Sequence, residues 1–359
     1  MASTYIYRTN GTPTLNTKCT VSFWWKNCEG QPSSGSDRII FGTETTAYSY
    51  IYLRNTGELG LYQASTGTFD FRTSRLMGDC GAWYHICYAF DSTLADSTER
   101  IKIYVNGVRE TAFNASTAMA QDSAIRFNEA SKVIDIGGGF GGYEYLDGLL
   151  SHFHFIDGTA YDASTFGETD STSGIWKIKT SPSVTYGNNG FFLKMEDSSN
   201  LDLDSSPNAH TFTTSGNLTA TKDNPSNNFC TMNRLWYGLQ SFTMENGNTR
   251  ITPSSNYGFP GNMAMNKGKW YFEAIPKAAS AGIGIVSGSA FQQGYLSDGT
   301  YAGGFGSFEG NKAYGYVSTA TTQYLLEATT TTESWGANLN HTTDVLQIAL
   351  DLDNNFLYF

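Results

Sequence analysis

The stretch Trp83-Tyr-His-Ile-Cys-Tyr-Ala-Phe90, followed by Ile101-Lys-Ile-Tyr-Val-Asn-Gly107, decides the fold of this chain. Both segments are short runs of β-branched and aromatic residues, which favour strands. Asn106-Gly107 predicts a tight hairpin turn, because Asn and Gly accept positive φ angles. Similar runs recur from Thr20-Val-Ser-Phe-Trp-Trp-Lys26 to Ile134-Asp-Ile136, with Gly, Asn, Asp and Ser between them. Many short strands joined by such turns predict a sandwich or jelly roll.

The composition indicates an all-β chain with more than one core. Aromatic residues make up 14% and charged residues 15% of the 359 residues, and there are 38 glycines. This balance favours strands and turns over helices. A length of 359 residues exceeds the roughly 100–200 residues of a typical domain, so we expect two domains and very little helix.

The charge balance excludes two classes of partner. Lys and Arg number 22 against 33 Asp and Glu, for a formal charge of −11, so the chain lacks the basic surface of a nucleic-acid-binding protein. No apolar run reaches the roughly eighteen residues that cross a bilayer. The start, Met1 to Thr9, has neither the basic residues nor the apolar core of a secretory signal. We therefore expect no nucleic acid, no membrane insertion and synthesis in a cytoplasm.

The first part of the chain resembles the laminin-G-like, or concanavalin-like, jelly roll. The motifs that carry this resemblance are Val21-Ser-Phe-Trp-Trp25, Trp83-Tyr-His85 before Tyr88-Ala-Phe-Asp91, Ile103-Tyr-Val-Asn-Gly107, and Leu146-Asp-Gly148 leading to Phe153-His-Phe-Ile-Asp-Gly158. Each motif alone is weakly specific, but their order and spacing match the family over about 220 residues. We assign residues 1–222 to this domain.

The last part resembles the SPRY β-sandwich. Lys269-Trp-Tyr-Phe-Glu-Ala274, Gly282-Ile-Gly-Ile285 and Asp344-Val-Leu-Gln-Ile-Ala-Leu-Asp-Leu-Asp353 match three strands of that family in order. After the final strand, Phe356 to Phe359, the Asn-Gly turn and Trp-bearing strand of the family do not follow. We therefore assign residues 236–359 to a SPRY-like sandwich that is truncated and completed by further residues or by a neighbouring chain.

The junction resembles a connector of tailed-bacteriophage structural proteins that joins these two domains in this order. It reads Lys222-Asp-Asn-Pro-Ser-Asn-Asn-Phe-Cys-Thr-Met-Asn233, and we assign residues 223–235 to a linker. The resemblance implies a virion protein in a tail fibre, spike or capsid-surface fibre, with other virion proteins as partners. By analogy with such fibres it also implies a homo-oligomer, with a trimer favoured.

Three functions remain open for such a protein. One is adhesion to a host-surface glycan, the second is a purely architectural role as a decoration or adaptor that docks other virion subunits, and the third is a glycan depolymerase. Glycosidases need two carboxyl groups roughly 5–10 Å apart, and the Glu-x-Asp-x-x-Glu motif of concanavalin-like glucanases is absent. No Ser lies in a Gly-x-Ser-x-Gly elbow. We therefore name no catalytic residue and expect no enzyme activity.

Two polar sets could bind a metal. Asp197, Asn200, Asp202 and Asp204 place hard oxygen ligands on one short loop, which suits calcium, but such residues also form ordinary turns in which their side chains bond their own backbone. We favour the turn and expect no cofactor, with calcium as the alternative. His152 and His154 lie two apart on a predicted strand, and we interpret them as a solvated or interface pair rather than a metal site.

Exposed tyrosines are the residues best suited to a sugar ligand. A tyrosine offers a flat apolar face to a sugar ring, while its hydroxyl can bond sugar or water. Tyr48, Tyr50, Tyr143 and Tyr145 flank or occupy predicted loops and are the candidate ligand-binding residues. Alternation along a strand would also place one of each i, i+2 series in the core, so burial is the competing interpretation.

Overall fold

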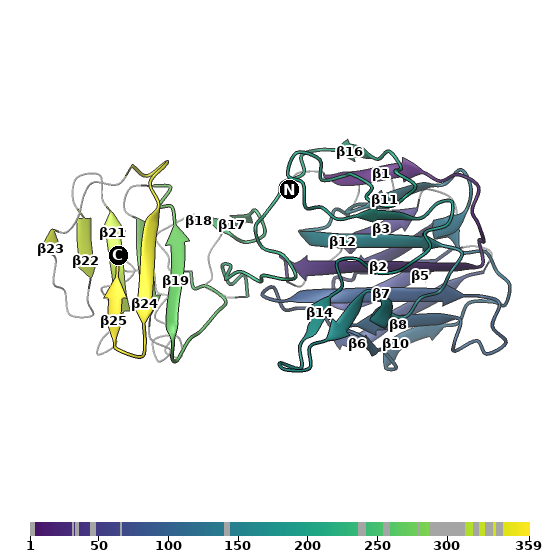
Figure 1. The fold of residues 1–359 in the computed structure, drawn as a ribbon, viewed down its shortest axis with the longest axis horizontal. Coiled ribbons are helices and arrows are strands. Elements are labelled where there is room, and N and C mark those ends of the chain that lie inside the picture. The colour runs from purple at the N-terminus through teal and green to yellow at the C-terminus, as the bar shows by residue number, and fades with distance from the viewer. Residues whose placement is uncertain are drawn as a thin grey trace. The chain divides into compact units, whose positions relative to one another are not determined.

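The computed structural model describes residues 4–30, 32, 36–43, 48–64, 67–139, 144–235, 242–253, 259–278, 281–286, 313–318, 323–326, 333–334 and 340–359. The chain divides into two compact units, Met1–Phe229 and Cys230–Phe359, and the division falls inside the segment predicted as a linker (Figure 1). Within the described ranges all strand pairs are antiparallel and the only helices are two 3-10 turns, which confirms the all-β prediction. No helix there is long and apolar enough to span a membrane.

The first unit contains an eight-stranded sheet in the order β16-β1-β11-β3-β4-β5-β6-β10. Its strands are β1 (Tyr5–Thr9), β3 (Arg38–Thr43), β4 (Ser49–Leu53), β5 (Glu58–Gln63), β6 (Phe69–Leu76), β10 (Phe113–Thr117), β11 (Val133–Ile136) and β16 (Thr213–Ser215). The strand β1 pairs with β11 on one side and with β16 on the other. Segments from both ends of the unit therefore close the same sheet.

The opposing sheet has six strands in the order β15-β12-β2-β7-β8-β9. Its strands are β2 (Lys18–Asn27), β7 (Trp83–Asp91), β8 (Ile101–Val105), β9 (Val108–Arg109), β12 (Gly148–Asp157) and β15 (Phe191–Leu193). Figure 1 shows β12, β2 and β7 side by side. Asn106 and Gly107 join β8 to β9 with φ angles of 49° and 77°, which confirms the predicted hairpin turn.

The core of the first unit lies between these two sheets. Phe23 and Phe153 from the six-stranded sheet stack with ring centroids 5.1 Å apart, and Phe41 from the eight-stranded sheet lies 5.4 Å from Phe153. All three are fully buried. Because alternate residues of each strand point inward, the strand pattern read from the sequence supplies this core.

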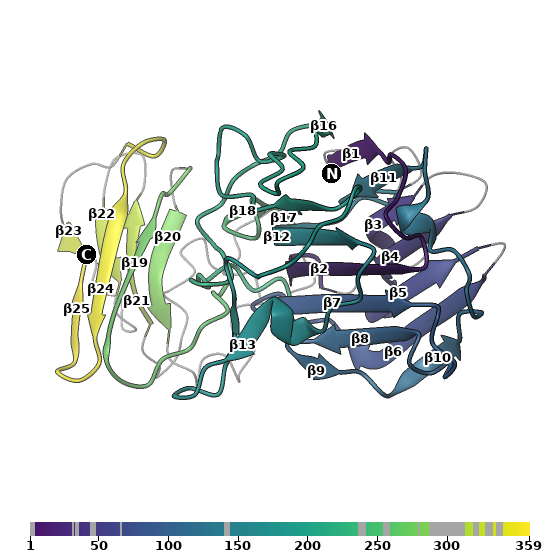
Figure 2. The ribbon, with the colours of Figure 1, turned by 45° about the vertical axis from the view of Figure 1, so that its right-hand side comes forward.

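The outer face of the six-stranded sheet is covered by the chain itself. Residues 158–190 cross it with η2 (Ala163–Thr165), β13 (Gly167–Thr169) and β14 (Trp176–Ile178) (Figure 2). Cys87, Ile156, Ala163 and Phe166 form a small second core there, with Trp176 packed against it. A Cβ on Gly107 would lie 2.4 Å from the Trp176 ring. The glycine in this turn therefore also allows the covering segment to pack closely.

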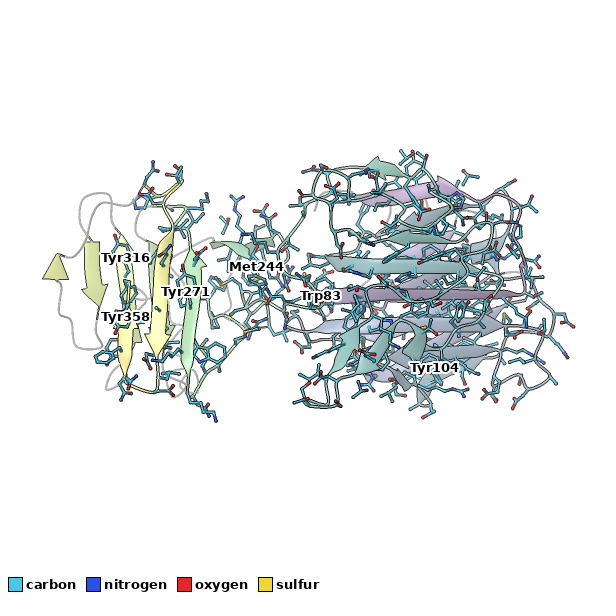
Figure 3. All side chains as sticks on the ribbon, in the orientation of Figure 1. Trp83, Tyr104, Met244, Tyr271, Tyr316 and Tyr358 are labelled. Carbon is cyan, nitrogen blue, oxygen red and sulfur yellow. The ribbon has the colours of Figure 1, made fainter. Side chains whose placement is uncertain are left out.

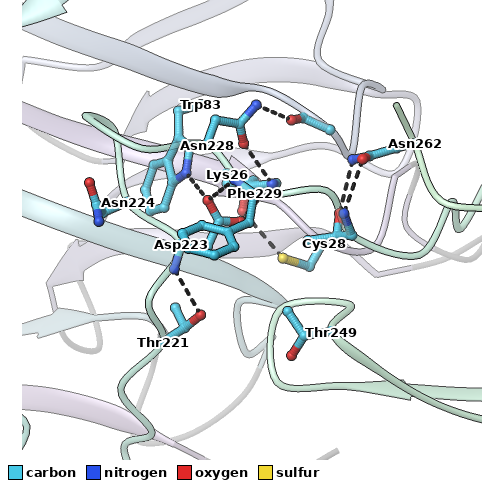
Figure 4. Close-up of polar contacts among 12 residues, drawn as sticks. Lys26, Cys28, Trp83, Thr221, Asp223, Asn224, Asn228, Phe229, Thr249 and Asn262 are labelled. Carbon is cyan, nitrogen blue, oxygen red and sulfur yellow. Dashed lines mark hydrogen bonds and ion pairs between the residues drawn. The ribbon is translucent and has the colours of Figure 1, made fainter. Parts of the chain in front are cut away.

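The connector is anchored to the first unit by a buried ion pair (Figure 4). The Nζ of Lys26 lies 2.7 Å from Oδ2 of Asp223 and donates to Oδ1 of Asn228 at 2.9 Å. The indole Nε1 of Trp83 donates to Oδ1 of Asp223 at 2.9 Å. Lys26 is 0% and Asp223 is 3% exposed. We call Lys26, Trp83, Asp223 and Asn228 the connector latch; it makes residues 223–229, predicted as linker, part of the first unit.

The second unit consists of antiparallel sheets with a small core. Its strands are β17 (Phe242–Glu245), β18 (Arg250–Pro253), β19 (Lys269–Ala274), β20 (Ala281–Val286), β21 (Ala313–Ser318), β22 (Gln323–Leu326), β23 (Glu333–Ser334), β24 (Leu346–Asp351) and β25 (Phe356–Tyr358). The strands order as β19-β24-β25 and β20-β21-β22-β23, with a separate β17-β18 hairpin. Tyr316, Leu346 and Ile348 are buried together. The three motifs taken from the sequence are thus β19, β20 and β24, while the SPRY-like assignment stays a prediction.

Candidate functional site

The outer face of the eight-stranded sheet carries a cluster of tyrosines on β4 and β5. Ile51 and Leu61 point into the core, so alternation turns Tyr50, Tyr52 and Tyr62 to the opposite face. Tyr50 is the direct partner of Tyr62 across the two strands. Tyr48, which precedes β4, joins them, and we call Tyr48, Tyr50, Tyr52 and Tyr62 the tyrosine platform.

The rings of the tyrosine platform contact one another. The centroid of the Tyr50 ring lies 5.5 Å from that of Tyr62, 5.6 Å from that of Tyr48 and 4.9 Å from that of Tyr52. Tyr48, Tyr50 and Tyr62 are half-buried, and Tyr52 is buried. A Cβ on Gly60 would lie 2.2 Å from the Tyr52 ring, so this ring rests on the backbone of β5. Mutual packing leaves the rings little freedom, which reduces the entropy lost on binding a ligand.

The electrostatic setting raises the pKa of two platform hydroxyls, those of Tyr50 and Tyr52. Burial, followed by the neighbouring Tyr52 and Tyr48, raises the pKa of Tyr50 above its usual range. Burial, followed by the charges of Asp70 and Asp37, raises the pKa of Tyr52 in the same direction. A protonated phenol both donates and accepts hydrogen bonds. The platform therefore combines apolar ring faces with hydroxyls suited to the hydroxyls of a sugar.

An acid–base pair borders the platform on β6. Asp70 is the strand partner of Tyr62, and Arg72 is the strand partner of Gly60, beneath the Tyr52 ring. The Nη2 of Arg72 lies 3.4 Å from Oδ2 of Asp70, and both side chains are partly exposed. Among the described residues, Oδ1 of Asp70 and Nε of Arg72 have no hydrogen-bond partner. The pair is therefore only partly satisfied.

Buried polar contacts beneath the platform fix its strands. The hydroxyl of Ser49 donates to Oε1 of Gln63 at 2.9 Å, and the Nε2 of Gln63 donates to the carbonyl oxygens of Gly67 and Ala124, each at 3.1 Å. Ser49 and Gln63 are strand partners that point inward, and each is the chain neighbour of a platform tyrosine. The register that pairs Tyr50 with Tyr62 is thus held from the core side.

The predicted tyrosines have different fates. Tyr48 and Tyr50 lie together in the platform, whereas Tyr143 lies outside the described residues. The Tyr145 ring lies 6.1 Å from that of Tyr5, which in turn lies 5.6 Å from that of Tyr7. Tyr7 and Tyr50 occupy one row of the sheet, through Asp135 on β11 and Gly42 on β3. Three strand spacings, about 14 Å, therefore separate the tyrosines on β1 from the platform.

Sequence reasoning missed Tyr52 and Tyr62, and a local signal could have found Tyr62. The turn at Asn55-Thr-Gly57, with Gly57 at a φ angle of 90°, joins β4 to β5. In a hairpin centred on Thr56, residues at equal distances before and after the turn pair with each other. Position 50 then pairs with position 62, as observed in the structure. Tyr5 and Tyr7 could not be found in this way, because β1 reaches the sheet through pairing with β11, more than 120 residues later.

The carboxylates among the predicted calcium ligands accept hydrogen bonds from protein groups, both within their own turns and from other segments. Asp197 accepts hydrogen bonds from the backbone N–H and hydroxyl of Ser199, which lower the pKa of its carboxyl group, and Asp202 accepts from Thr214 at 2.6 Å. Buried Asp204 accepts from the backbone N–H groups of Phe192, Ser206 and His210 and from the hydroxyl of Ser206. Among the described residues no group of three or more His, Cys, Asp or Glu side chains could hold a metal. The backbone of Asn200 donates to the carbonyl oxygen of Asp197 and accepts from the N–H of Leu203.

The prediction of a solvated histidine pair is wrong. His152 is 6% and His154 is 2% exposed. A bulge lies between Ser151 and His154 in the pairing with β2, and His152 has a φ angle of 48°. The ring of His154 stacks on Phe192 at 3.8 Å, and its Nδ1 lies 3.1 Å from the hydroxyl of Tyr186. The outer face of β12 is thus packed where the alternation pattern suggested solvent.

One serine–histidine contact resembles a catalytic pair but has the wrong proton arrangement. The Nε2 of His85 lies 2.9 Å from the hydroxyl oxygen of Ser22, and both residues are buried. The indole of Trp176 donates to Nδ1 of His85 at 3.1 Å. Because an indole N–H can only donate, Nδ1 accepts and Nε2 carries the proton. His85 cannot therefore remove a proton from Ser22, and burial lowers its pKa to about 3.

Comparison with known proteins bears on the first unit. Residues 2–164 match the family model described as the concanavalin A-like lectin/glucanases superfamily. No curated protein sequence matches the chain.

Solved structures give distant likenesses. The heptameric SAP-like pentraxin of Limulus polyphemus is 18% identical over 53% of this chain and 88% of its own, with a TM-score of 0.34. Domains LG4-5 of the mouse laminin α1 chain are 9% identical over 97% of this chain and 65% of theirs, with a TM-score of 0.35. Tailspike protein 2 of the Escherichia coli O157:H7 bacteriophage CAB120 is 11% identical over 45% of this chain and 22% of its own, with a TM-score of 0.27.

The matched residues 2–164 contain strands from both sheets and most of the core of the first unit. Two antiparallel sheets packed face to face around one core form the sandwich that the sequence motifs predicted. The first unit therefore has the laminin-G-like, concanavalin-like jelly-roll fold.

Proposed function

We propose that the first unit is a non-enzymatic glycan-binding module within a virion protein of a tailed phage, in a tail fibre, spike or capsid-surface fibre. The observation that carries the glycan-binding role is the tyrosine platform, whose rings contact one another on the outer face of the eight-stranded sheet. The virion setting rests on the resemblance of residues 222–233 to the phage connector. The host-surface glycan would be the receptor.

The physical basis of binding is the match between a sugar and the platform. One face of a pyranose ring presents C–H groups, which pack against an aromatic face, while its rim presents hydroxyls. The half-buried rings of Tyr50 and Tyr62 offer the apolar surface, and the pair Asp70 and Arg72 offers polar groups beside it. The arrangement would bind a sugar by stacking and hydrogen bonding.

The experiment uses the full chain and its Tyr50→Ala and Tyr62→Ala variants on an array of bacterial surface and other oligosaccharides. We expect the wild-type chain to retain a defined set of glycans. Each substitution should weaken that binding about tenfold, the effect of roughly 1.4 kcal/mol, because it removes a stacking ring. Affinity for the best glycan is measured by titration calorimetry.

Tyr358→Ala is the matched control, because it removes a tyrosine that is 57% exposed on the second unit. Melting curves establish that the variants are folded. Binding that keeps its wild-type affinity in both platform variants would contradict the proposal. Release of reducing ends from any retained glycan would contradict its non-enzymatic part.

A second candidate function is docking of other virion subunits, and it is favoured by an aromatic stripe on the second unit. Tyr271 on β19 and Tyr358 on β25 flank Ala349 in one row of the sheet (Figure 3). The ring of Phe356 lies beside that of Tyr358. Tyr271 is 57%, Phe356 54% and Tyr358 57% exposed. Exposed aromatic residues are enriched in protein interfaces, so this unit would serve assembly within a homo-oligomeric appendage, a trimer by analogy with phage fibres.

A further inference from the structure

The charges around the tyrosine platform distinguish between two classes of glycan. Acidic glycans of cell surfaces carry groups such as carboxylate, sulfate or phosphate, and such a group is bound tightly where an arginine or lysine is available to it. The ion pairs of the eight-stranded sheet therefore bear on which class the platform accepts.

The arginines on or next to β3, β4 and β6 each have a carboxylate partner. Their guanidinium nitrogens lie 2.6 to 3.4 Å from carboxylate oxygens, in the pairs Arg38–Glu29, Arg54–Glu58, Arg72–Asp70 and Arg75–Glu110. The sequence contains no lysine between Lys26 and Lys102, the segment that supplies β3 to β6. An acidic sugar on the platform would thus meet cations that are already neutralised.

The acidic groups near the platform oppose an anion. Asp70 lies next to Tyr62 in the sheet, and the charges of both Asp70 and Asp37 act on the hydroxyl of Tyr52. Placing a carboxylate or sulfate beside these groups adds like-charge repulsion in a partly desolvated setting. The formal charge of −11 for the whole chain adds a long-range repulsion of the same sign.

The Asp70–Arg72 pair suits a hydroxyl group instead. A carboxylate oxygen only accepts and a guanidinium only donates, whereas a sugar hydroxyl does both. The contact of 3.4 Å leaves Oδ1 of Asp70 and Nε of Arg72 without partners among the described residues, and an unsatisfied buried polar atom is unfavourable. Both side chains are partly exposed, 28% for Arg72 and 29% for Asp70. Modest rotation of either would let neighbouring hydroxyls of one sugar bond the two.

We propose that the platform selects uncharged oligosaccharides and rejects acidic glycans. Hydroxyls of one sugar bond to Asp70 and Arg72, while the ring of that sugar or of the next sugar in the oligosaccharide lies on Tyr62 and Tyr50. This inference rests on the proposed glycan-binding function. Tyr50, Tyr62 and Asp70 occupy one row across three neighbouring strands, a span of about 10 Å. Asp70 acts as the specificity-determining residue, because it neutralises Arg72 and repels anions.

The test compares each neutral sugar with a form of it that carries an acidic group. The full chain is titrated with neutral lactosamine, cello- and galacto-oligosaccharides, and with the sialylated, uronate or sulfated form of each, in low and in physiological salt. We expect the neutral member of the retained pair to bind at least tenfold more tightly. In Asp70→Asn the neutral sugar should bind about tenfold more weakly, while the acidic form gains affinity because Arg72 is then unpaired.

Two further variants separate the outcomes. Arg72→Gln should weaken binding of the neutral sugar and leave the acidic form rejected. Asp170→Asn changes the net charge by the same amount but removes the partner of Lys177, 2.5 Å away on the β13–β14 hairpin, so it should change neither affinity.

Tighter binding of the acidic members by the wild-type chain would overturn this inference and leave glycan binding intact. The same holds for an Asp70→Asn variant that keeps the wild-type ratio of neutral to acidic affinity. Failure of every sugar to bind the folded wild-type chain would overturn both the inference and the proposed function.

Discussion

At the scale of single residues, burial sets the charge of His85 more strongly than any neighbour. The ring is fully buried between Ser22 and Trp176, and burial lowers its pKa from 6.5 to about 3. Both hydrogen bonds of the ring are made in the neutral form. His85 is thus a structural histidine that holds Trp176 and the covering segment on the six-stranded sheet.

The lowered pKa of His85 predicts an acid-sensitive fold. Between pH 6.5 and about pH 3 the unfolded chain binds a proton at this histidine that the folded chain does not. The free energy of unfolding should therefore fall as the pH is lowered through this window, by about 1.4 kcal/mol per pH unit for one such group, and the contribution is fully present above pH 6.5. Denaturant unfolding from pH 7 to pH 4 measures the slope.

His85→Phe provides the comparison for that slope. It should lower stability at every pH, because Ser22 and Trp176 lose their partner, and it should also make the curve shallower. His154 contributes in the same direction, since burial lowers its pKa as well, so some slope should remain. Parallel curves for the variant and the wild-type chain would show that His85 does not titrate as described.

At the scale of elements, the connector latch ties the end of the first unit to β2. Asp223 accepts hydrogen bonds from Lys26, Trp83 and the backbone N–H of Phe229, and Asn228 donates to the carbonyl oxygen of Gly81. Removing one charge from a buried ion pair leaves the other charge buried without a counter-charge. Segment 223–229 is therefore an integral part of the jelly roll rather than a tether.

We predict that Asp223→Asn destabilises the first unit by about 3–5 kcal/mol, because the ammonium of Lys26 remains buried without a counter-charge. The double variant Lys26→Met, Asp223→Asn should lose less than the single one, since neither charge is left in the interior. Glu99→Gln is the control, at an exposed pair in which Arg109 lies 2.8 Å from Glu99, and should change stability by less than about 1 kcal/mol. Chemical denaturation of the full chain gives all three values. A double variant that loses as much stability as Asp223→Asn, or more, would rule out the coupling.

At the scale of the whole molecule, the two units carry different exposed aromatic surfaces. Three tyrosines of the platform in the first unit are half-buried and Tyr52 is buried, whereas Tyr271, Phe356 and Tyr358 of the second unit are each more than half exposed. Polar side chains border the stripe, since Lys269 pairs with Asp351 and the hydroxyl of Tyr271 donates to Glu273. An apolar centre with a polar rim is the usual anatomy of a protein interface.

From the proposed docking function, we predict that Tyr271→Ser combined with Tyr358→Ser leaves glycan binding unchanged. The same double variant should weaken attachment of the chain to phage particles that lack it, or its own self-association, by about tenfold or more. The reason is the loss of two exposed aromatic anchors from the centre of the stripe. Sedimentation of chain with particles and light scattering of the chain alone measure the two effects. Tyr50→Ala is the reciprocal control, and a loss of particle attachment in that variant alone would assign docking to the first unit.

Local patterns in the sequence were enough for the strands, the Asn106-Gly107 turn and the two-sheet class, because alternation and turn chemistry act over a few residues. They also marked Tyr48 and Tyr50. The burial of the two histidines was not predictable, because it depends on distant segments. His154 packs against Phe166 and Tyr186 of segment 158–190, which folds back over the sheet, and His152 packs against Phe192 of β15. Nor was the fate of Asp204, whose two oxygens are occupied by contacts with three separate residues.

The residue types thus determine the order of the strands and which side of each strand is apolar. Pairing between distant strands determines which side chains lie next to one another on a sheet face. Tyr5 meets Tyr145, and Asp223 meets Lys26, across more than a hundred residues of chain. Such contacts form only when the core between the sheets repays the entropy of closing long loops. For that reason the sequence could nominate tyrosines as ligands for sugar, but only the tertiary structure assembled four of them on one face beside Asp70 and Arg72.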